Sequence, residues 1–251
     1  MIATQDVTFP GPGGRPQRAA LCEPEADADA PAPAAGRPAL LVLHEILGLN
    51  DDIRRIAGRF AEAGYVALVP DYFDADASRP VCVWRAMTAL RRGEGPVFEL
   101  LARARDFLAG RPGVDAARLG VVGFCMGGGF ALLYAARARL RVAGTFYGDV
   151  PKQARALAGI GPVCGGYGAR DAVFGRGGAR LAAHLDALGV RHDLVTYPDA
   201  GHSYMSRHGG ALAVLGRLGP LRAAYDAPAA EDSWRRMLTF FGEQLGHETA
   251  P

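Results

Sequence analysis

The chain has 251 residues, and its hydrophobic content of 49% allows a substantial core, so we expect residues 1–251 to form a single domain. The formal net charge is +2, and the arginines are scattered, which argues against a basic stripe that follows nucleic acid phosphates. No segment has the roughly 20 apolar residues of a membrane-spanning helix, and the N-terminus shows no export signal. We therefore expect a cytoplasmic protein that contacts neither nucleic acid nor a membrane.

The predicted elements alternate between strands and helices along most of the chain. Residues 26–35 contain two prolines and no apolar period, which predicts a solvated loop between two early strands. The predicted strands after this loop are Ala39–His44, Tyr65–Val69, Leu119–Phe124, Val142–Tyr147, Pro162–Tyr167 and Asp193–Tyr197. The predicted helices are one that is capped by Asp51 or Asp52 and stops at Gly64, followed by Phe98–Ala109, Gly129–Ala138, Gly177–Leu188 and Ser233–Leu245. This alternation predicts an α/β fold with a mostly parallel central sheet and helices on both faces.

The stretch Phe73–Pro96 fits neither the helical nor the strand period well. In a chain of βαβ units, an insertion after a strand usually covers the carboxyl edge of the sheet. Residues 73–96 are therefore a candidate lid over the substrate.

Cysteine and histidine spacing argues against a metal site. The four cysteines are widely spaced and form no C-x-x-C pair: Cys22, Cys82, Cys125 and Cys164. This spacing disfavours a zinc ribbon or a disulfide framework and favours reduced thiols. His44 and Glu45 begin like the zinc motif H-E-x-x-H, but Gly48 stands at the second ligand position. We expect no metal and no cofactor.

The segment Gly123–Gly127, with the sequence GFCMG, lies between a predicted strand and a predicted helix, which is the context of a nucleophile elbow. The elbow needs small residues around a strained central residue, and here the central residue is Cys125. None of the serines has this glycine frame: Ser78, Ser203, Ser206 and Ser233. The helix dipole favours a thiolate at Cys125, and the Met126 N–H would face the same space as an oxyanion donor. The alternative is a buried structural cysteine in a glycine-rich turn.

A thiol nucleophile needs a base, and in this class of enzyme the chain order is nucleophile, acid, histidine. Asp171 follows the strand Pro162–Tyr167, and His202 follows Asp193–Tyr197. Asp199 competes for the acid role but is interpreted as a solvated turn residue. Four further histidines are interpreted as surface residues: His184, His192, His208 and His247.

Glu45 comes directly after a buried strand, where an ionisable group is either a paired structural residue or part of an active site.

Four motifs together resemble the dienelactone hydrolase (carboxymethylenebutenolidase) family, in order from about Leu40 to the C-terminus. They are HEILGLND at 44–51, GFCMGG at 123–128, GARD at 168–171 and PDAGHS at 198–203. The resemblance implies an α/β-hydrolase fold and a Cys-His-Asp triad of Cys125, His202 and Asp171. It implies an oxyanion hole formed by the Met126 and Ile46 N–H groups. It also implies that Glu45 pairs with the resting thiol until a substrate displaces it.

The substrate-binding residues depart from the family pattern. The well-studied enzymes bind a substrate carboxylate with an arginine shortly after the histidine, and in this chain Arg207 is displaced by one position. Arg79 and Arg85 in the insertion are further candidates, as are Tyr147 and Tyr204.

The predicted activity is hydrolysis of an ester or enol-lactone bond in a small molecule, through an acyl-thioester intermediate. The predicted protein is a monomer or a homodimer. The alternatives are a general carboxylesterase or thioesterase, a non-catalytic ligand-binding protein on the same fold, and a thiol-redox protein that pairs Cys125 with Cys164.

Overall fold

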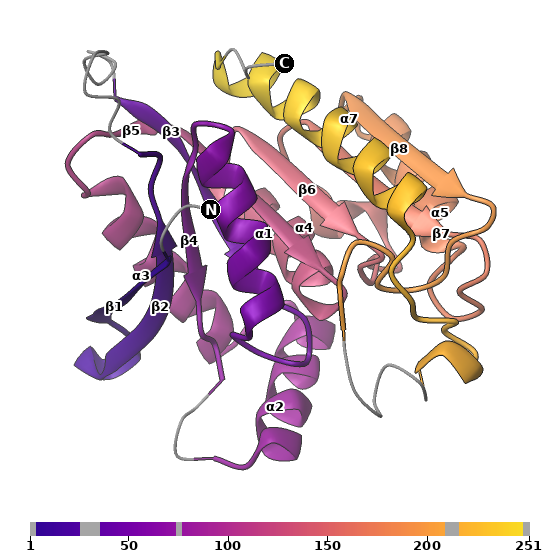
Figure 1. The fold of residues 1–251 in the computed structure, drawn as a ribbon, viewed down its shortest axis with the longest axis horizontal. Helices are drawn as coiled ribbons and strands as arrows, with labels where there is room; N and C mark the ends of the chain where they lie inside the picture. The colour runs from indigo at the N-terminus through magenta and orange to yellow at the C-terminus, as the bar shows by residue number, and fades with distance from the viewer. Residues whose placement is uncertain (1–3, 26–35, 74–76, 209–215, 248–251) are drawn as a thin grey trace.

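The computed structural model describes residues 4–25, 36–73, 77–208 and 216–247. Within them, a single sheet has the strand order β1-β2-β4-β3-β5-β6-β7-β8 (Figure 1). The strands are β1 Thr4–Pro10, β2 Pro16–Cys22, β3 Arg37–Leu43, β4 Val66–Pro70, β5 Val114–Phe124, β6 Val142–Phe146, β7 Val163–Gly168 and β8 His192–Tyr197. Strands β3 to β8 pair in parallel, whereas β1 and β2 pair antiparallel at one edge. The predicted mostly parallel sheet is confirmed.

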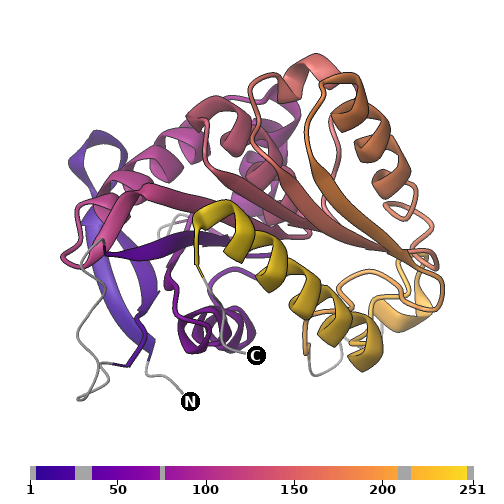
Figure 2. The ribbon, with the colours of Figure 1, turned by 90° about the horizontal axis from the view of Figure 1, so that it is seen from above.

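Helices cover both faces of this sheet, as the sequence predicts. They are α1 Asp51–Glu62, α2 Arg79–Arg92, α3 Pro96–Ala109, α4 Met126–Ala138, α5 Gly177–Ala187 and α7 Ala227–Leu245. Figure 2 shows α1 and α7 on one side of the sheet, with α3, α4 and α5 on the other. Alternate residues of β5 serve the two layers, since Val121 packs in the core under α3 to α5 and Val122 in the core under α1 and α7. The parallel strands therefore bury both faces.

The start of α1 differs in detail from the expectation. Asn50, not Asp51 or Asp52, is the N-cap, because its side-chain oxygen accepts a hydrogen bond from the Ile53 N–H at 3.0 Å. The two aspartates lie in the first turn, where they favour the helix dipole. The predicted stop at Gly64 is confirmed, since α1 ends at Glu62 and Gly64 has a φ of +90°.

The segment 73–96 contains a helix that its sequence pattern conceals. The buried residues of α2 are spaced as on one helix face, but most of them are small: Cys82, Ala86, Ala89 and Leu90. The larger Val81 and Trp84 face solvent instead, and Trp84 is 69% exposed. The apolar period is therefore blurred, although the helix is regular.

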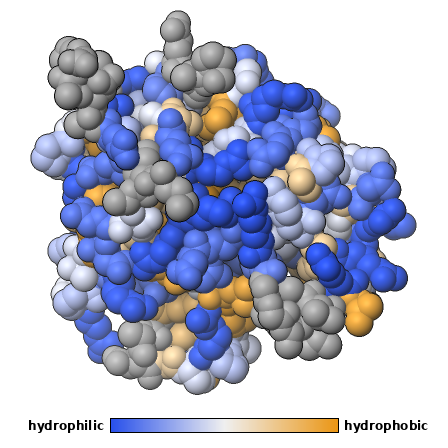
Figure 3. All heavy atoms as spheres, in the orientation of Figure 1, coloured by the Kyte–Doolittle hydropathy of each residue, from blue (hydrophilic) through white to orange (hydrophobic). Residues whose placement is uncertain are grey.

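The position of α2 places it beside the carboxyl end of the sheet. In Figure 1, α2 lies below the sheet, and the Arg79 guanidinium donates a hydrogen bond to the Leu47 carbonyl in the loop after β3. Figure 3 shows a largely hydrophilic face on which hydrophobic atoms gather near the lower edge, where α2 lies. The candidate lid thus contacts the loop that carries Glu45 and Ile46.

Residues 26–35 were expected to join two early strands, and β2 and β3 are the strands on either side. The loop itself lies outside the described residues. Strand β1 is additional, and it pairs with β2 from Thr4 opposite Cys22 to Pro10 opposite Pro16. Among the described residues, no helix has the length and apolarity that crossing a bilayer requires.

Candidate active site

Cys125 occupies a strained turn between β5 and α4. Its φ of 53° and ψ of −120° lie outside the regions that a residue with a side chain prefers. The Cys125 N–H donates to the Phe146 carbonyl at 3.0 Å, and the Cys125 carbonyl accepts from the Gly128 N–H at 3.0 Å. The two bonds hold this residue at the carboxyl end of β5, with its side chain half-buried. The strand-turn-helix geometry of an elbow is therefore present.

Glycines on both sides of Cys125 make the turn sterically feasible. A Cβ atom on Gly123 would lie 2.0 Å from the Gly127 carbonyl oxygen, and one on Gly127 would lie 2.3 Å from the Leu43 carbonyl oxygen. The clashing atoms belong to the backbone, so no side chain can rotate to relieve the contact. The close passage of β5, α4 and the end of β3 thus requires glycine.

Replacing Gly123 with alanine is expected to lower the free energy of unfolding by roughly 3 kcal/mol or more, because the added methyl group overpacks a rigid backbone contact. Urea unfolding followed by circular dichroism measures this loss. Gly58 in α1 is the matched control, since a Cβ there meets no atom within 4 Å. Gly58→Ala is expected to stabilise by up to about 1 kcal/mol. Equal effects of the two substitutions would contradict the steric argument.

His202 and Asp171 meet at the edge where β7 and β8 end. The His202 Nδ1 atom lies 2.6 Å from Asp171 Oδ2, and their side chains are only 4% and 1% exposed. The other oxygen, Asp171 Oδ1, accepts the Val173 N–H at 2.9 Å and the Phe174 N–H at 3.0 Å. The carboxylate is thus fixed on one side by backbone amides and fixes the imidazole on the other. Nδ1 is committed, so Nε2 is the nitrogen left for proton transfer.

The protonated form of His202 is favoured by its neighbours. Burial alone lowers the pKa of the imidazole, but its interactions with Asp171 and with Cys125 outweigh burial and raise the pKa from 6.5 to about 10. The thiol is therefore near enough to contribute, although Nε2 has no hydrogen-bond partner among the described residues. This environment favours the imidazolium form of His202.

Glu45 is buried in a pocket of hydrogen-bond donors next to this pair. Its Oε1 accepts from the Ser206 hydroxyl at 2.9 Å and the Ser203 hydroxyl at 3.2 Å, and its Oε2 lies 2.5 Å from His208 Nε2. The interpretation of His208 as a surface histidine is therefore wrong, since this ring is largely buried and pairs with a carboxylate. The expected pairing of Glu45 with the resting thiol is not among the hydrogen bonds of the described residues.

Met126 and Ile46 are the two residues whose backbone N–H groups were expected to bind an oxyanion. Neither the Met126 N–H, at the first residue of α4, nor the Ile46 N–H donates a hydrogen bond within the part of the chain that the structure describes. Ile46 follows β3 and its side chain is 42% exposed. The start of α4 passes close to the end of β3, since a Cβ on Gly127 would lie 2.3 Å from the Leu43 carbonyl oxygen and 2.7 Å from that of His44.

Comparison with known proteins places the chain in a family. The sequence model of the dienelactone hydrolase family matches residues 26–245. A curated protein from Escherichia coli named "Putative carboxymethylenebutenolidase" is 30% identical over 228 residues, covering 84% of this chain and 79% of that protein. The chain belongs to the dienelactone hydrolase family. The predictions of this family and of an enzyme that hydrolyses carboxylic esters are thereby confirmed.

Solved structures agree with the family assignment. A "Putative Dienelactone Hydrolase" from Klebsiella pneumoniae is 26% identical with a TM-score of 0.75, and the match covers 97% of this chain and 99% of that one. The dienelactone hydrolase from Anabaena variabilis, at 18% identity and a TM-score of 0.70 over 97% of this chain and 99% of that one, shares the fold. The predicted α/β-hydrolase fold is confirmed. Membership of the dienelactone hydrolase family implies a small-molecule ester or lactone as the substrate.

The candidate substrate residues of this dienelactone hydrolase family member are dispersed. The Arg207 guanidinium lies over the Tyr225 ring at 4.8 Å and donates to its hydroxyl at 3.2 Å. Arg79 contacts the Leu47 carbonyl, and Arg85 is exposed on α2. None of these contacts brings an arginine to Cys125.

The two candidate tyrosines are buried. The Tyr147 ring centre lies 5.0 Å from that of His202, and the Tyr147 hydroxyl bonds to Ser206 at 3.0 Å. Tyr204 directs its hydroxyl to Ser233 at 2.8 Å, away from the triad. Tyr147 therefore belongs to the Glu45 pocket, whereas Tyr204 packs beneath it.

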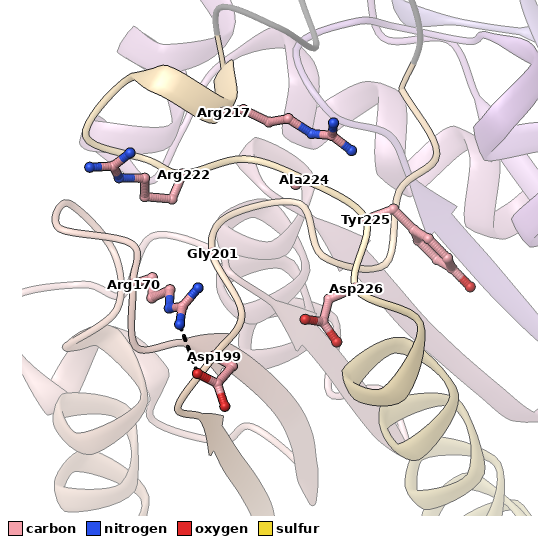
Figure 4. Close-up of a pocket in the computed structure, with 8 residues that line it drawn as sticks. All are labelled: Arg170, Asp199, Gly201, Arg217, Arg222, Ala224, Tyr225 and Asp226. Carbon is pink, nitrogen blue, oxygen red and sulfur yellow. Dashed lines mark hydrogen bonds and ion pairs between the residues drawn. The ribbon is translucent and has the colours of Figure 1, made fainter.

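A hollow of about 560 Å³ lies outside the predicted triad (Figure 4). Its lining residues are Arg170, Asp199, Gly201, Arg217, Arg222, Ala224, Tyr225 and Asp226. Asp199 is 79% exposed there and pairs with Arg170 at 2.9 Å, as expected for a solvated turn aspartate. Figure 4 shows the side chains of Arg217 and Arg222 extending in different directions, so the arginines do not converge on one ligand position.

Cys164 is buried in the core under α1 and α7. Burial raises the pKa of its thiol. A buried neutral thiol suits core packing better than disulfide exchange with Cys125, so the redox alternative loses support.

Proposed function

We propose that Cys125, His202 and Asp171 form a catalytic triad that hydrolyses an ester or an enol lactone. The observation that carries the proposal is the 2.6 Å contact between His202 Nδ1 and Asp171 Oδ2 at the edge of the sheet where Cys125 sits on its elbow. Asp171 holds the ring in the tautomer whose Nε2 can accept a proton. A positioned base next to a thiol is what nucleophilic catalysis requires.

In the first half of the reaction, His202 takes the proton of the Cys125 thiol, and the sulfur attacks the carbonyl carbon. The carbonyl oxygen becomes an oxyanion that accepts hydrogen bonds from the Met126 and Ile46 N–H groups. The intermediate then collapses, the carbon–oxygen ester bond breaks, and the imidazolium returns its proton to the leaving oxygen. An ester yields an acyl thioester on Cys125 and a free alcohol or enol. A lactone yields a thioester whose acyl group still carries the alcohol or enol.

In the second half, His202 removes a proton from water, and the hydroxide attacks the thioester carbonyl. The same two amides stabilise the second oxyanion. Breaking the carbon–sulfur bond releases the carboxylic acid, and the sulfur regains its proton from the imidazolium.

The four cysteines of the chain are free, and an uncapped thiol nucleophile suits a reducing cytosol, which supports a cytoplasmic location.

The test is to trap the acyl enzyme. With p-nitrophenyl acetate in excess, acid quenching within the first turnovers is expected to yield protein that is heavier by one acyl group. Peptide mass spectrometry should place this group on Cys125. An enol lactone should give an adduct with the mass of the whole substrate, because its leaving group stays attached.

An acyl group on a serine or a lysine would contradict the proposal, as would turnover without any covalent adduct when hydrolysis of the intermediate is slowed at low temperature. A non-catalytic ligand-binding protein would give neither turnover nor adduct. A cysteine with a purely structural role does not need a strained backbone, whereas Cys125 has a φ of 53°.

A further inference from the structure

The Glu45 carboxylate is held by one loop, residues 203–208, at both of its oxygens. Ser203 and Ser206 donate to Oε1, and His208 pairs with Oε2 at 2.5 Å. Ser206 also bonds to the Tyr147 hydroxyl at 3.0 Å. A carboxylate buried this deeply needs a counter-charge, and among these partners only His208 can supply one.

The charges of Glu45 and Cys125 act on the same neighbours. Burial is the main cause of the raised pKa of Tyr147, and the charges of Glu45 and Cys125 add to it. The same two groups act on Tyr72. Glu45 also interacts with His202. An uncompensated negative charge at Glu45 would therefore change the electrostatics of the groups that surround Cys125 and His202.

The groups that face His208 come from three elements. Glu45 lies in the loop after β3, Asp52 in α1 and His202 in the loop after β8. Asp52 is itself paired with Arg55 at 2.7 Å and accepts the Arg207 N–H at 3.0 Å. Glu45 is thus the carboxylate that pairs directly with His208, whereas Asp52 is engaged by Arg55 and by the Arg207 N–H.

We propose that His208 is a positioning residue of the reaction, which as an imidazolium holds Glu45 against Ser203 and Ser206 and balances its charge beside Cys125 and His202. The inference rests on the proposed function and adds a residue to it. The hydrogen bond and charge of Glu45 raise the pKa of His208, while burial works in the opposite direction. The charge of His208 is therefore fully present below its ordinary value of about 6.5 and is lost as the pH rises through the raised value.

The experiment compares kcat/KM for p-nitrophenyl acetate in the parent protein and in His208→Gln over a range of pH. Gln keeps a hydrogen-bond donor but carries no charge. We expect the parent to be about tenfold faster at about pH 6, because a charge this close shifts the ionisation of its neighbours by about one pH unit. The ratio should fall toward one as the pH rises through the raised pKa of His208, because the parent then loses the charge that Gln lacks. His208→Lys should keep the advantage to higher pH than the parent does.

Two controls separate this role from packing. In a Glu45→Gln background, His208→Gln should have no further effect beyond about twofold, because the charge that His208 balances is gone. His192 pairs with the exposed Asp186 at 3.0 Å at the start of β8, so His192→Gln removes a histidine–carboxylate pair at the opposite end of that strand from His202 and should leave kcat/KM unchanged at every pH. Thermal unfolding of each variant checks that it is folded.

A parent-to-variant ratio that is the same at all pH values, or a loss of equal size in the Glu45→Gln background, would overturn the role of His208. Neither result would touch the proposed function, provided that the acyl group is still trapped on Cys125. Absence of that adduct would overturn the proposed function instead. The two failures are therefore distinguishable.

Discussion

Cys125→Ala is expected to lower kcat/KM for p-nitrophenyl acetate by about 10⁴-fold or more. The methyl group of alanine cannot attack a carbonyl. The binding site and the two backbone donors at Met126 and Ile46 remain, so the residual rate should still exceed that in water. Initial rates under pseudo-first-order conditions measure the loss.

Cys164→Ala is the matched control, because it removes a sulfur of the same size from the core and not from the elbow. It is expected to cost some stability but to keep kcat/KM within about twofold. Loss of activity in Cys164→Ala alone would instead favour the redox alternative. Retention of activity in Cys125→Ala would exclude the thiol as the nucleophile.

The elements that sequence could predict are those whose cause is local. The elbow is encoded by Gly123, Cys125 and Gly127 within one short motif, and the backbone clashes at these glycines explain why the motif is so restrictive. Asp171 and His202 each follow a strand, and parallel strands bring their carboxyl ends to one edge. Asp171 and His202 could therefore be predicted to meet, although they are far apart in the sequence.

The partners of Glu45 could not be read from the sequence in the same way. His208 lies in a polar stretch with no helical or strand period, as surface histidines commonly do. Its burial depends on a loop after β8 that folds back onto the loop after β3. One available signal was the spacing of Ser203, Ser206 and His208 after His202, which puts three donors on one short segment.

Helix α2 was concealed for a related reason. Two of its four buried residues are alanines, whose apolar signal is weak, whereas Val81 and Trp84 are exposed to solvent. Hydrophobic periodicity indicates a buried face only when the large residues lie on that face. In α2 the larger apolar residues lie on the solvent face, so hydrophobic periodicity does not reveal the helix.

Asp171→Asn is expected to lower kcat by about 10⁴-fold while leaving the fold intact. The amide oxygen of Asn can replace Oδ1 as the acceptor for the Val173 and Phe174 N–H groups, so the loop should keep its shape. The amide nitrogen then faces His202 Nδ1, which must accept a hydrogen bond, and the ring proton moves to Nε2. In this tautomer the imidazole cannot take the thiol proton. Stopped-flow or steady-state hydrolysis of p-nitrophenyl acetate measures kcat.

The same substitution should also lower the pKa of His202 from about 10 toward its ordinary value, since the carboxylate supports the imidazolium. Histidine NMR signals titrated with pH report this change. Asp199→Asn is the matched control, because Asp199 was the rival acid and instead pairs with Arg170 at 2.9 Å on the surface. It should keep kcat within about twofold. If Asp199→Asn lost activity and Asp171→Asn did not, the acid role would have to be reassigned to Asp199. The pKa of His202 depends on the charge of the carboxylate that orients its ring, so it reports which aspartate has that role.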